Sequence, residues 1–362
     1  MHVNSANINR FKLPSQSQIN QIPISSKTKT FESIVKFNFS LNYNNILNDH
    51  SLLSYFRFPS SSTRIDLNRN FDLNENFSQS PTSISHLDNF INYLIDRDFS
   101  FNDYNFVTYR GILTKLSTLF YNYDEDFKFN CTLINDTIFI SDNSPLASPS
   151  NHFHKLSMYH GYAFEYYCTN DNDDVRVNTN EQYININDVT LSDKKILIAG
   201  EVDCINDNNE YVELKTSKVI TNRHDQNIFD KKLLKFYFQS YLLNISKIVV
   251  GFKDKKGFID DIKEFNTLDL PNLVKGKTFE WNPDVCLSLT SMLLDFISYN
   301  IKSHTKYVNK PNLTYQLNYV ASKRSLEINL IDDKDILKDD NDSIERVGFI
   351  PLKLFNHFNI PH

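Results

Sequence analysis

Glycine is scarce in this chain, with 7 among 362 residues. A loop that wraps a phosphate with its backbone needs closely spaced glycines, so the sequence contains neither a P-loop nor a dinucleotide-binding fingerprint. Cysteine is also sparse, and its 4 residues stand too far apart for a metal-ligand or disulfide pattern. No apolar run approaches the roughly 18 residues of a membrane span. These absences exclude P-loop NTPases, dinucleotide-dependent enzymes, disulfide-stapled domains and helical membrane proteins.

The charge balance further limits the classes of function that fit this sequence. The formal net charge is −6, with 38 basic and 44 acidic residues. A protein that coats nucleic acid by general electrostatic attraction is expected to be basic. Any RNA or DNA must therefore bind in a local cleft, with metal ions offsetting part of its charge. Hydrophobic residues make up 40% and charged residues 23%, which is typical of a globular chain with a large core.

Strand-like and helix-like segments alternate along the chain. This alternation predicts a single α/β domain with a mixed sheet and flanking helices over residues 26–362, in which residues 105–260 carry the motifs. The stretch 1–25, rich in Ser, Asn and Gln, is expected to be a flexible terminus. Strands are expected at Phe37–Leu47, Asn105–Tyr109 and Lys247–Phe252, and helices at His86–Asp98, Asn227–Ile245 and Val285–Tyr299.

Two neighbouring strand-like runs carry a dense set of charged residues. They span Ile196–Ile205 and Tyr211–Ser217, and the polar residues between them are typical of a turn. Pairing of Ile205 with Tyr211 would close them into a hairpin. The first run contains Glu-Val-Asp and the second Glu-Leu-Lys, so the hairpin would hold an E-x-D and an E-x-K pattern.

Alternation along a strand places Glu201 and Asp203 on one face, and likewise Glu213 and Lys215. In the hairpin register, Asp203 would lie opposite Glu213, and Glu201 opposite Lys215. Like charges in facing positions destabilise a sheet. A divalent cation bound by the carboxylates would remove this repulsion, and the lysine would stand beside a scissile phosphate. The alternative is a surface hairpin whose charges face water.

Glu165 lies in an aromatic segment, His160–Tyr167, which reads HGYAFEYY and is expected to be a strand or the end of one. A carboxylate buried among aromatic rings is costly unless a cation is near. A metal ion shared with the hairpin would supply that cation. The alternative is a glutamate exposed at a strand end.

The expected helix Asn227–Ile245 has one polar stripe. Lys232, Lys235 and Gln239 stand at positions i, i+3 and i+7, so they share a face. The rest of the helix is largely apolar and is expected to pack against the sheet, so the stripe faces either a cleft or solvent. Gln239 both donates and accepts hydrogen bonds, which suits a phosphate or an attacking water.

Arg110 follows the expected strand Asn105–Tyr109 and precedes a glycine. An arginine at a strand end can clamp a phosphate through two parallel hydrogen bonds. The alternative is an ordinary surface arginine.

In this order, these segments resemble the DXO family of decapping and RNA 5′-end nucleases, and the E-x-D and E-x-K pair resembles the core of the PD-(D/E)xK nuclease superfamily. The likeness is strongest to the fungal nuclear branch of the family, whose members partner a nuclear 5′–3′ exoribonuclease. The matching stretches are YRGILTKL at Tyr109–Leu116, GYAFE at Gly161–Glu165, GEVD at Gly200–Asp203, ELKTS at Glu213–Ser217 and KLLKFYFQSYL at Lys232–Leu242.

The resemblance implies a site with one or two Mg²⁺ or Mn²⁺ ions. Its ligands would be the carboxylates of Glu165, Glu201, Asp203 and Glu213, with the backbone carbonyl of Leu214.

The resemblance also implies the remaining roles. Lys215 and Gln239 would contact the scissile phosphate or the nucleophilic water, completing a catalytic set with Glu201, Asp203 and Glu213. The expected contacts with the RNA 5′ end are Tyr109, Arg110, Gly111 and Ile184.

The implied activity is hydrolysis at a phosphorus atom of RNA 5′ ends, in RNA quality control. The reaction could remove pyrophosphate from 5′-triphosphate RNA, release an incomplete cap, or degrade RNA onward from the 5′ end. Family members often carry arginine where this chain has Lys253, which leaves the substrate preference open. Two alternatives are a protein that mainly stabilises a 5′–3′ exoribonuclease, and a DNA nuclease of the PD-(D/E)xK type. The implied location is the nucleus, with the cytoplasm as the alternative, and no membrane association is expected.

Overall fold

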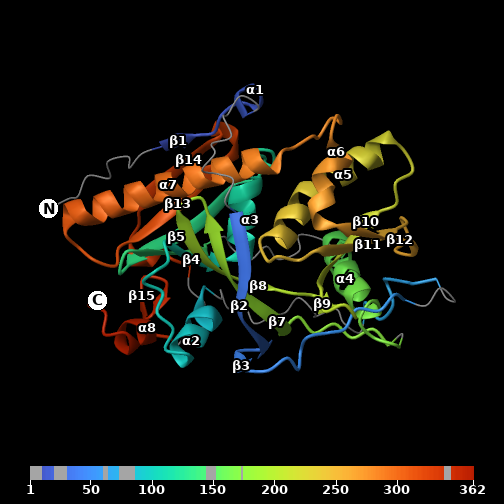
Figure 1. The fold of residues 1–362 in the computed structure, drawn as a ribbon, viewed down its shortest axis with the longest axis horizontal. Helices are drawn as coiled ribbons and strands as arrows, with labels where there is room; N and C mark the ends of the chain where they lie inside the picture. The colour runs from blue at the N-terminus through green and yellow to red at the C-terminus, as the bar shows by residue number, and fades with distance from the viewer. Residues whose placement is uncertain are drawn as a thin grey trace.

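The computed structural model describes residues 10–19, 31–59, 64–72, 86–143, 152–172, 174–337 and 344–362. Within these residues, a large and a small mixed β-sheet stand beside each other, with helices on their faces (Figure 1). The large sheet has ten strands. In spatial order they are β1 (Arg10–Lys12), β14 (Ser325–Leu330), β13 (Thr314–Val320), β5 (Phe127–Ile134), β6 (Thr137–Asp142), β4 (Phe106–Tyr109), β8 (Lys194–Glu201), β7 (Glu181–Leu191), β2 (Phe31–Asn42) and β3 (Asn45–Leu47).

The large sheet is covered on both faces. Its central strands β4 and β8 are parallel and almost wholly buried, as expected of strands with helices on either side. Helices α3 (Arg110–Thr118) and α7 (Pro283–Val308) cover one face, and α2 (Asp88–Asp96) and α8 (Leu352–His357) cover the other (Figure 1). Because α3 begins directly after β4, Arg110 stands at the carboxyl end of a central strand.

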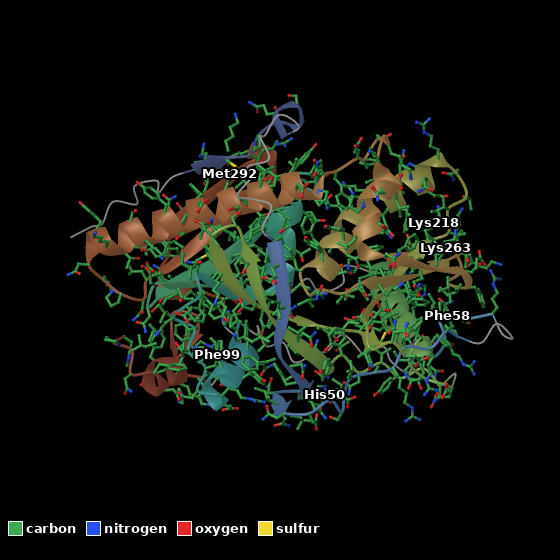
Figure 2. All side chains as sticks on the ribbon, viewed as in Figure 1. His50, Phe58, Phe99, Lys218, Lys263 and Met292 are labelled. Carbon is green, nitrogen blue, oxygen red and sulfur yellow. The ribbon has the colours of Figure 1, made fainter. Side chains whose placement is uncertain are left out.

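The small sheet carries the E-x-K strand. Its order is β12 (Ile259–Asn266), β11 (Lys247–Lys253), β10 (Tyr211–Lys218) and β9 (Cys204–Ile205). Helix α4 (His152–Tyr167) packs against one face of this sheet, and α5 (Arg223–Tyr241), which connects the parallel strands β10 and β11, packs against the other. In Figure 2, Lys218 and Lys263 mark the small sheet, and Met292 marks α7 over the large one.

Alternation along β10 separates its two kinds of side chain. Val212 and Leu214 join the apolar cluster beneath α4. Glu213 and Lys215 therefore point to the other side, towards α3 and α5.

Shorter elements complete the described chain. The C-terminal segment is fixed to α2 by Arg346, whose buried guanidinium lies 2.7 Å from Asp88. Among the described segments, no helix combines the length and apolarity needed to cross a bilayer. The short elements are α1 (Gln16–Ile19), α6 (Leu270–Val274), the strand pair β15 (Arg346–Val347) and β16 (Ile350–Pro351), and 3₁₀ helices at Thr267–Asp269, Ala321–Lys323 and Asp333–Asp335.

The α/β class predicted from the sequence is confirmed, and α2, α5 and α7 occupy the three expected helices. The expected flexible terminus is wrong for Arg10–Lys12, because these residues form β1 against β14, with Arg10 paired to Glu327 at 2.7 Å. Residues 1–9 and 20–25 of this stretch lie outside the described residues.

The expected strand at His160–Tyr167 is also wrong, because this segment is the second half of α4. Tyr159, Ala163 and Phe164 are buried at helical spacing and pack on the small sheet. Aromatic residues favour strands, but burial of one helix face overrides that preference. Glu165 consequently projects from a helix.

Candidate active site

Glu213 on β10 is the most buried carboxylate of the predicted site, with no exposed surface. Arg110 Nη1 donates to both of its oxygens, at 3.3 and 3.1 Å, and Lys215 Nζ lies 2.6 Å from Oε1. Burial raises the pKa of Glu213, but Lys215 and Arg110 outweigh this effect and hold the pKa below its usual value. Glu213 is therefore ionised, and it supplies the counter-charge for two partly buried cations.

The predicted hairpin forms, but its two strands separate before the acidic pairs. The pairing of Ile205 with Tyr211 is confirmed, and the ladder ends one pair later. Glu201 instead ends β8 of the large sheet, opposite Ile184, so its expected position opposite Lys215 is wrong. The chain passes from the large to the small sheet just after Glu201. The acidic residues are thus gathered where the two sheets meet.

Asp203 lies in this crossing between the sheets. Its Oδ2 accepts a hydrogen bond from the backbone N–H of Leu214 at 2.6 Å, and Lys215 Nζ is 3.8 Å away. This bond replaces the expected ladder position of Asp203 opposite Glu213. Burial and the charge of Glu213 raise the pKa of Asp203 to about 6.

Glu201 receives a hydrogen bond from Gln182 Nε2 on β7, at 3.2 Å from its Oε2. Burial and the charge of Asp203 raise the pKa of Glu201 to about 7, and Arg110 offsets part of this rise. Gln182 is not among the predicted site residues. Its only signal in the sequence is strand alternation, which puts it on the same face as Ile184.

Glu165 reaches the same region from α4. Burial raises its pKa well above the usual value, the charge of Asp203 adds to the rise, and Lys215 opposes it. The structure therefore brings all four predicted carboxylates within electrostatic reach of each other. Their counter-charges are Arg110 and Lys215, so two negative charges remain unbalanced when all four carboxylates ionise.

These residues fit a divalent cation. Carboxylate and carbonyl oxygens are ligands of the kind that Mg²⁺ and Mn²⁺ take. In the part of the chain that the structure describes, no group of three or more His, Cys, Asp or Glu side chains is placed so that it could hold a metal ion. The fit rests on charge instead, because unbalanced buried carboxylates have raised pKa values that a divalent cation would lower again.

Arg110 is turned inwards, which excludes the ordinary surface arginine considered above. Its side chain is only 14% exposed, and Nη1 also donates to the backbone carbonyl of Gln239 at 3.3 Å. It thus ties the start of α3 to both β10 and α5. Its contact with an RNA 5′ end stays a prediction.

Gly200, the first residue of the GEVD stretch, allows this close approach. A Cβ added to it would lie 2.8 Å from Arg110 Cβ and 2.9 Å from Leu243 Cδ1. We expect Gly200→Ala to displace Arg110 from Glu213 and to lower kcat/KM at least about tenfold, because small misplacements in a site cost this much or more.

The matched control for that variant is Gly161→Ala in α4, where an added Cβ meets nothing within 4 Å. Alanine is the better helix former, so this change should leave kcat/KM intact and raise stability by about 0.5–1 kcal/mol. Thermal melts and steady-state kinetics of both variants check the pair. Wild-type kinetics in Gly200→Ala would refute the packing role.

Two cavities flank the turn from β4 into α3. The smaller, of about 320 Å³, is lined mainly by apolar side chains and reaches Ile184 and Glu201. The larger, of about 620 Å³, reaches Gln239 and is lined by four lysines from α3 and α5. Tyr109 and Gly111 border both cavities. The predicted substrate contacts other than Lys215 therefore each line one cavity or both.

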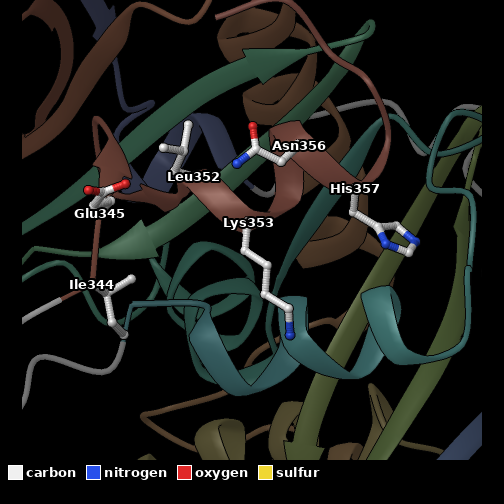
Figure 3. A pocket seen from close by; sticks show the side chains of 6 residues that line it. All are labelled: Ile344, Glu345, Leu352, Lys353, Asn356 and His357. Atoms are coloured by element: carbon white, nitrogen blue, oxygen red, sulfur yellow. The ribbon is translucent and has the colours of Figure 1, made fainter.

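A further cavity, of about 590 Å³, lies beside α8 and contains none of the predicted site residues (Figure 3). Two of its lining side chains are already engaged. Lys353 Nζ is 3.9 Å from Asp96, and His357 Nε2 is 3.0 Å from Asp98. We do not assign the active site to this cavity.

The site combines an E-x-D motif whose glutamate ends one strand, an E-x-K strand in the adjoining sheet, a helical glutamate and two partly buried basic residues, which are the features of a PD-(D/E)XK nuclease. A family model described as "RAI1 like PD-(D/E)XK nuclease" matches residues 32–352. The chain belongs to this family.

Individual relatives agree with this assignment. The Neurospora crassa decapping nuclease RAI1 is 30% identical over an alignment of 301 residues, and the match covers 73% of this chain and 71% of the relative. The Xenopus laevis decapping and exoribonuclease protein is 36% identical over an alignment of 222 residues, and the match covers 56% of this chain and 54% of the relative.

Solved structures show the same fold. The crystal structure of S. pombe Rai1 in complex with 3′-FADP has a TM-score of 0.73 and 26% identity, and the match covers 90% of this chain and 99% of that one. Candida albicans Rai1, solved in complex with pU5 and Mn²⁺, has a TM-score of 0.71 and 23% identity, with 86% and 93% covered.

Proposed function

We propose that this protein hydrolyses RNA 5′ ends with one or two bound Mg²⁺ or Mn²⁺ ions. The observation that carries the proposal is the buried Glu213 held between Arg110 and Lys215, with Asp203 and Glu201 beside it. The excess of carboxylates over basic residues favours a bound cation, and Lys215 places a positive charge among them that can contact an anionic substrate. The decapping activity in the names of the relatives points to RNA 5′ ends as that substrate.

The proposed ligands are Glu165, Glu201, Asp203, Glu213 and the backbone carbonyl of Leu214. When bound there, a divalent ion would lower the pKa of an attacking water and offset charge on the phosphoryl oxygens.

The chain's own residues would orient the reactants. Burial lowers the pKa of Lys215, but Glu213 and Asp203 outweigh this and raise the pKa above its usual value. Lys215 therefore stays an ammonium, which can donate to the oxygens of the scissile phosphate. Gln239, at the border of the larger cavity, would orient the water or the phosphate. Water adds to phosphorus, and the bond to the leaving oxygen breaks.

The two cavities suit two parts of a substrate. The smaller has Phe39, Phe90 and Tyr109 in its wall, which favour a stacked base of the 5′-terminal group. The larger cavity is lined by four lysines and four carboxylates, but Lys232 and Lys235 make no direct ion pair among the described residues and would be available to phosphates of the RNA strand. The hydrolysed phosphate would lie between them, next to Glu201 and Arg110.

A panel of 5′ ends tests the proposal. RNAs carrying a 5′-triphosphate, an unmethylated cap, a nicotinamide-type cap or a 5′-monophosphate would be incubated with Mg²⁺ or Mn²⁺, beside duplex DNA. We expect pyrophosphate or an intact cap structure to be released from RNA, and shortening of the monophosphate RNA would add exonuclease activity. Cleavage of duplex DNA alone would favour the DNA nuclease.

The pKa values predict how activity depends on pH. Burial raises the pKa of Glu201 to about 7 and that of Asp203 to about 6, so protons compete with the metal ion for both groups below neutrality. At subsaturating Mn²⁺, activity should rise steeply from pH 5.5 to 7.5. Saturating Mn²⁺ should shift the rise to lower pH. The same pH profile at both Mn²⁺ concentrations would contradict this coupling.

A nuclear location and a nuclear 5′–3′ exoribonuclease partner are part of the proposal, supported by the family's RAI1-like character. Affinity purification of the tagged protein, with quantitative mass spectrometry of nuclear and cytoplasmic fractions, tests both. Absence of any 5′–3′ exoribonuclease from the nuclear eluate would contradict the proposed partner.

A further inference from the structure

The four lysines that line the larger cavity are not equivalent. Lys231 Nζ lies 3.2 Å from Asp124, and Lys115 Nζ lies 3.5 Å from a carboxylate on β6, so these two charges are neutralised. Among the described residues, no carboxylate lies within ion-pairing distance of Lys232 or Lys235. Lys232 and Lys235 therefore make no direct ion pair among the described residues, although Glu125, whose charge acts on Lys235, also lines the cavity.

Lys232 on α5 contacts β10, the strand that carries Glu213 and Lys215. Its Nζ is 3.3 Å from Ser217 Oγ on β10. Ser217 is two residues beyond Lys215 on the same face, which is about 6.6 Å along a strand. Lys232 is half-buried, and this burial lowers its pKa. A cation held in this setting gains from an anionic ligand.

Lys235 lies one turn further along the same face of α5. Desolvation lowers its pKa, and the charges of Lys215 and Arg110 add to this, while Glu125 opposes it. Lys235 is therefore close enough to Lys215 and Arg110 for their positive charges to lower its pKa. It remains exposed, so a polymer in the cavity could reach it.

The cavity wall contains a further unused polar group. Thr114 is 2% exposed and lines the cavity, and its hydroxyl has no hydrogen-bond partner among the described residues. The floor beside it is apolar, with Ile112 and Phe127. Such a wall suits the sugar and base of a nucleotide whose phosphates face the lysines.

We infer that Lys232 and Lys235 clamp successive backbone phosphates of the RNA strand on the 3′ side of the hydrolysed phosphate. The inference rests on the proposed function, since it extends that site along the strand. Repeating phosphates suit two lysines on one helix face, whereas the leaving group suits the smaller, apolar cavity. The clamp would make catalysis depend on RNA length.

Kinetics on short and long RNA test the clamp. The substrates are a 5′-triphosphate dinucleotide and a 5′-triphosphate 12-mer. The variants are Lys232→Met with Lys235→Met, and Lys263→Met as the control, since Lys263 is paired with Asp261 at 3.2 Å and does not line the cavity. The double variant should lose about tenfold or more in kcat/KM on the 12-mer, mainly through KM, and less than twofold on the dinucleotide. The control should stay within twofold on both.

Equilibrium binding of a 5′-hydroxyl 12-mer, which offers no 5′ phosphate to hydrolyse, tests the clamp without turnover. Because each phosphate contact to a single strand contributes about 0.7 to the slope of log K against log salt, the double variant should lower that slope by about 1.4. An unchanged slope, or equal losses on the dinucleotide and the 12-mer, would overturn the clamp. Wild-type protein that binds the 12-mer with the expected slope but turns over neither substrate would refute the proposed function and leave the clamp standing.

Discussion

Asp203→Asn should abolish hydrolysis and at the same time stabilise the metal-free protein. The asparagine keeps the shape of the side chain and an oxygen for the Leu214 N–H. It loses the charge of one proposed ligand, so we expect kcat to fall by about 10²–10³-fold or more, the scale on which removal of one charge-stabilising group acts.

The gain in stability follows from the raised pKa of Asp203, about 6 against a usual 3.8, caused by burial and Glu213. A carboxyl group with a raised pKa destabilises the fold above that pKa, and the penalty disappears as pH falls below the usual value. Removing the charge should therefore add on the order of 1–3 kcal/mol at pH 7.5 and almost nothing near pH 4. Denaturant unfolding in EDTA at both pH values measures this, and a destabilised variant at pH 7.5 would contradict it.

Glu213→Gln should also be inactive, but unlike Asp203→Asn it should destabilise the protein. It leaves Arg110 without its carboxylate and Lys215 with only the more distant Asp203. Removing one partner of a buried ion pair costs about 3–5 kcal/mol, because a buried charge loses its counter-charge. For a chain of 362 residues this corresponds to a fall in melting temperature of about 4–7 °C.

The pH dependence of this loss has a definite sign. Because Lys215 and Arg110 outweigh burial and hold the pKa of Glu213 below its usual value, its stabilising effect is present at neutral pH and is lost in acid. The difference in melting temperature between wild type and variant should thus shrink below about pH 4. Glu264→Gln, on an exposed surface pair with Lys247, is the control and should change stability by less than about 1 kcal/mol. Equal losses in both variants would contradict the account.

Much of this site could be predicted from local sequence. The turn between the two acidic runs fixed the pairing of Ile205 with Tyr211, and helical spacing put Lys232 and Lys235 on one face of α5. These predictions succeed because the residues involved are close in the chain, where alternation and helical period decide which side chains share a face.

The rest depends on partners that are distant in sequence. The ion pair between Arg110 and Glu213 joins residues 103 positions apart. Glu201 belongs to the large sheet because β8 pairs along its whole length with β7, and the chain enters the small sheet only after Glu201. No local pattern distinguishes such a strand from one that continues its hairpin. The aromatic segment around Glu165 is helical for a similar reason, since its burial against the small sheet outweighs local propensity.

The most direct test of the central claim is turnover of 5′-triphosphate RNA after chelation and Mn²⁺ add-back. Wild-type protein should release no pyrophosphate and no shortened RNA in EDTA, and should recover full turnover when Mn²⁺ is restored, while Asp203→Asn should stay inactive in both conditions. Turnover that persists in EDTA, or that Mn²⁺ restores equally in Asp203→Asn, would contradict a metal-dependent site built on these carboxylates.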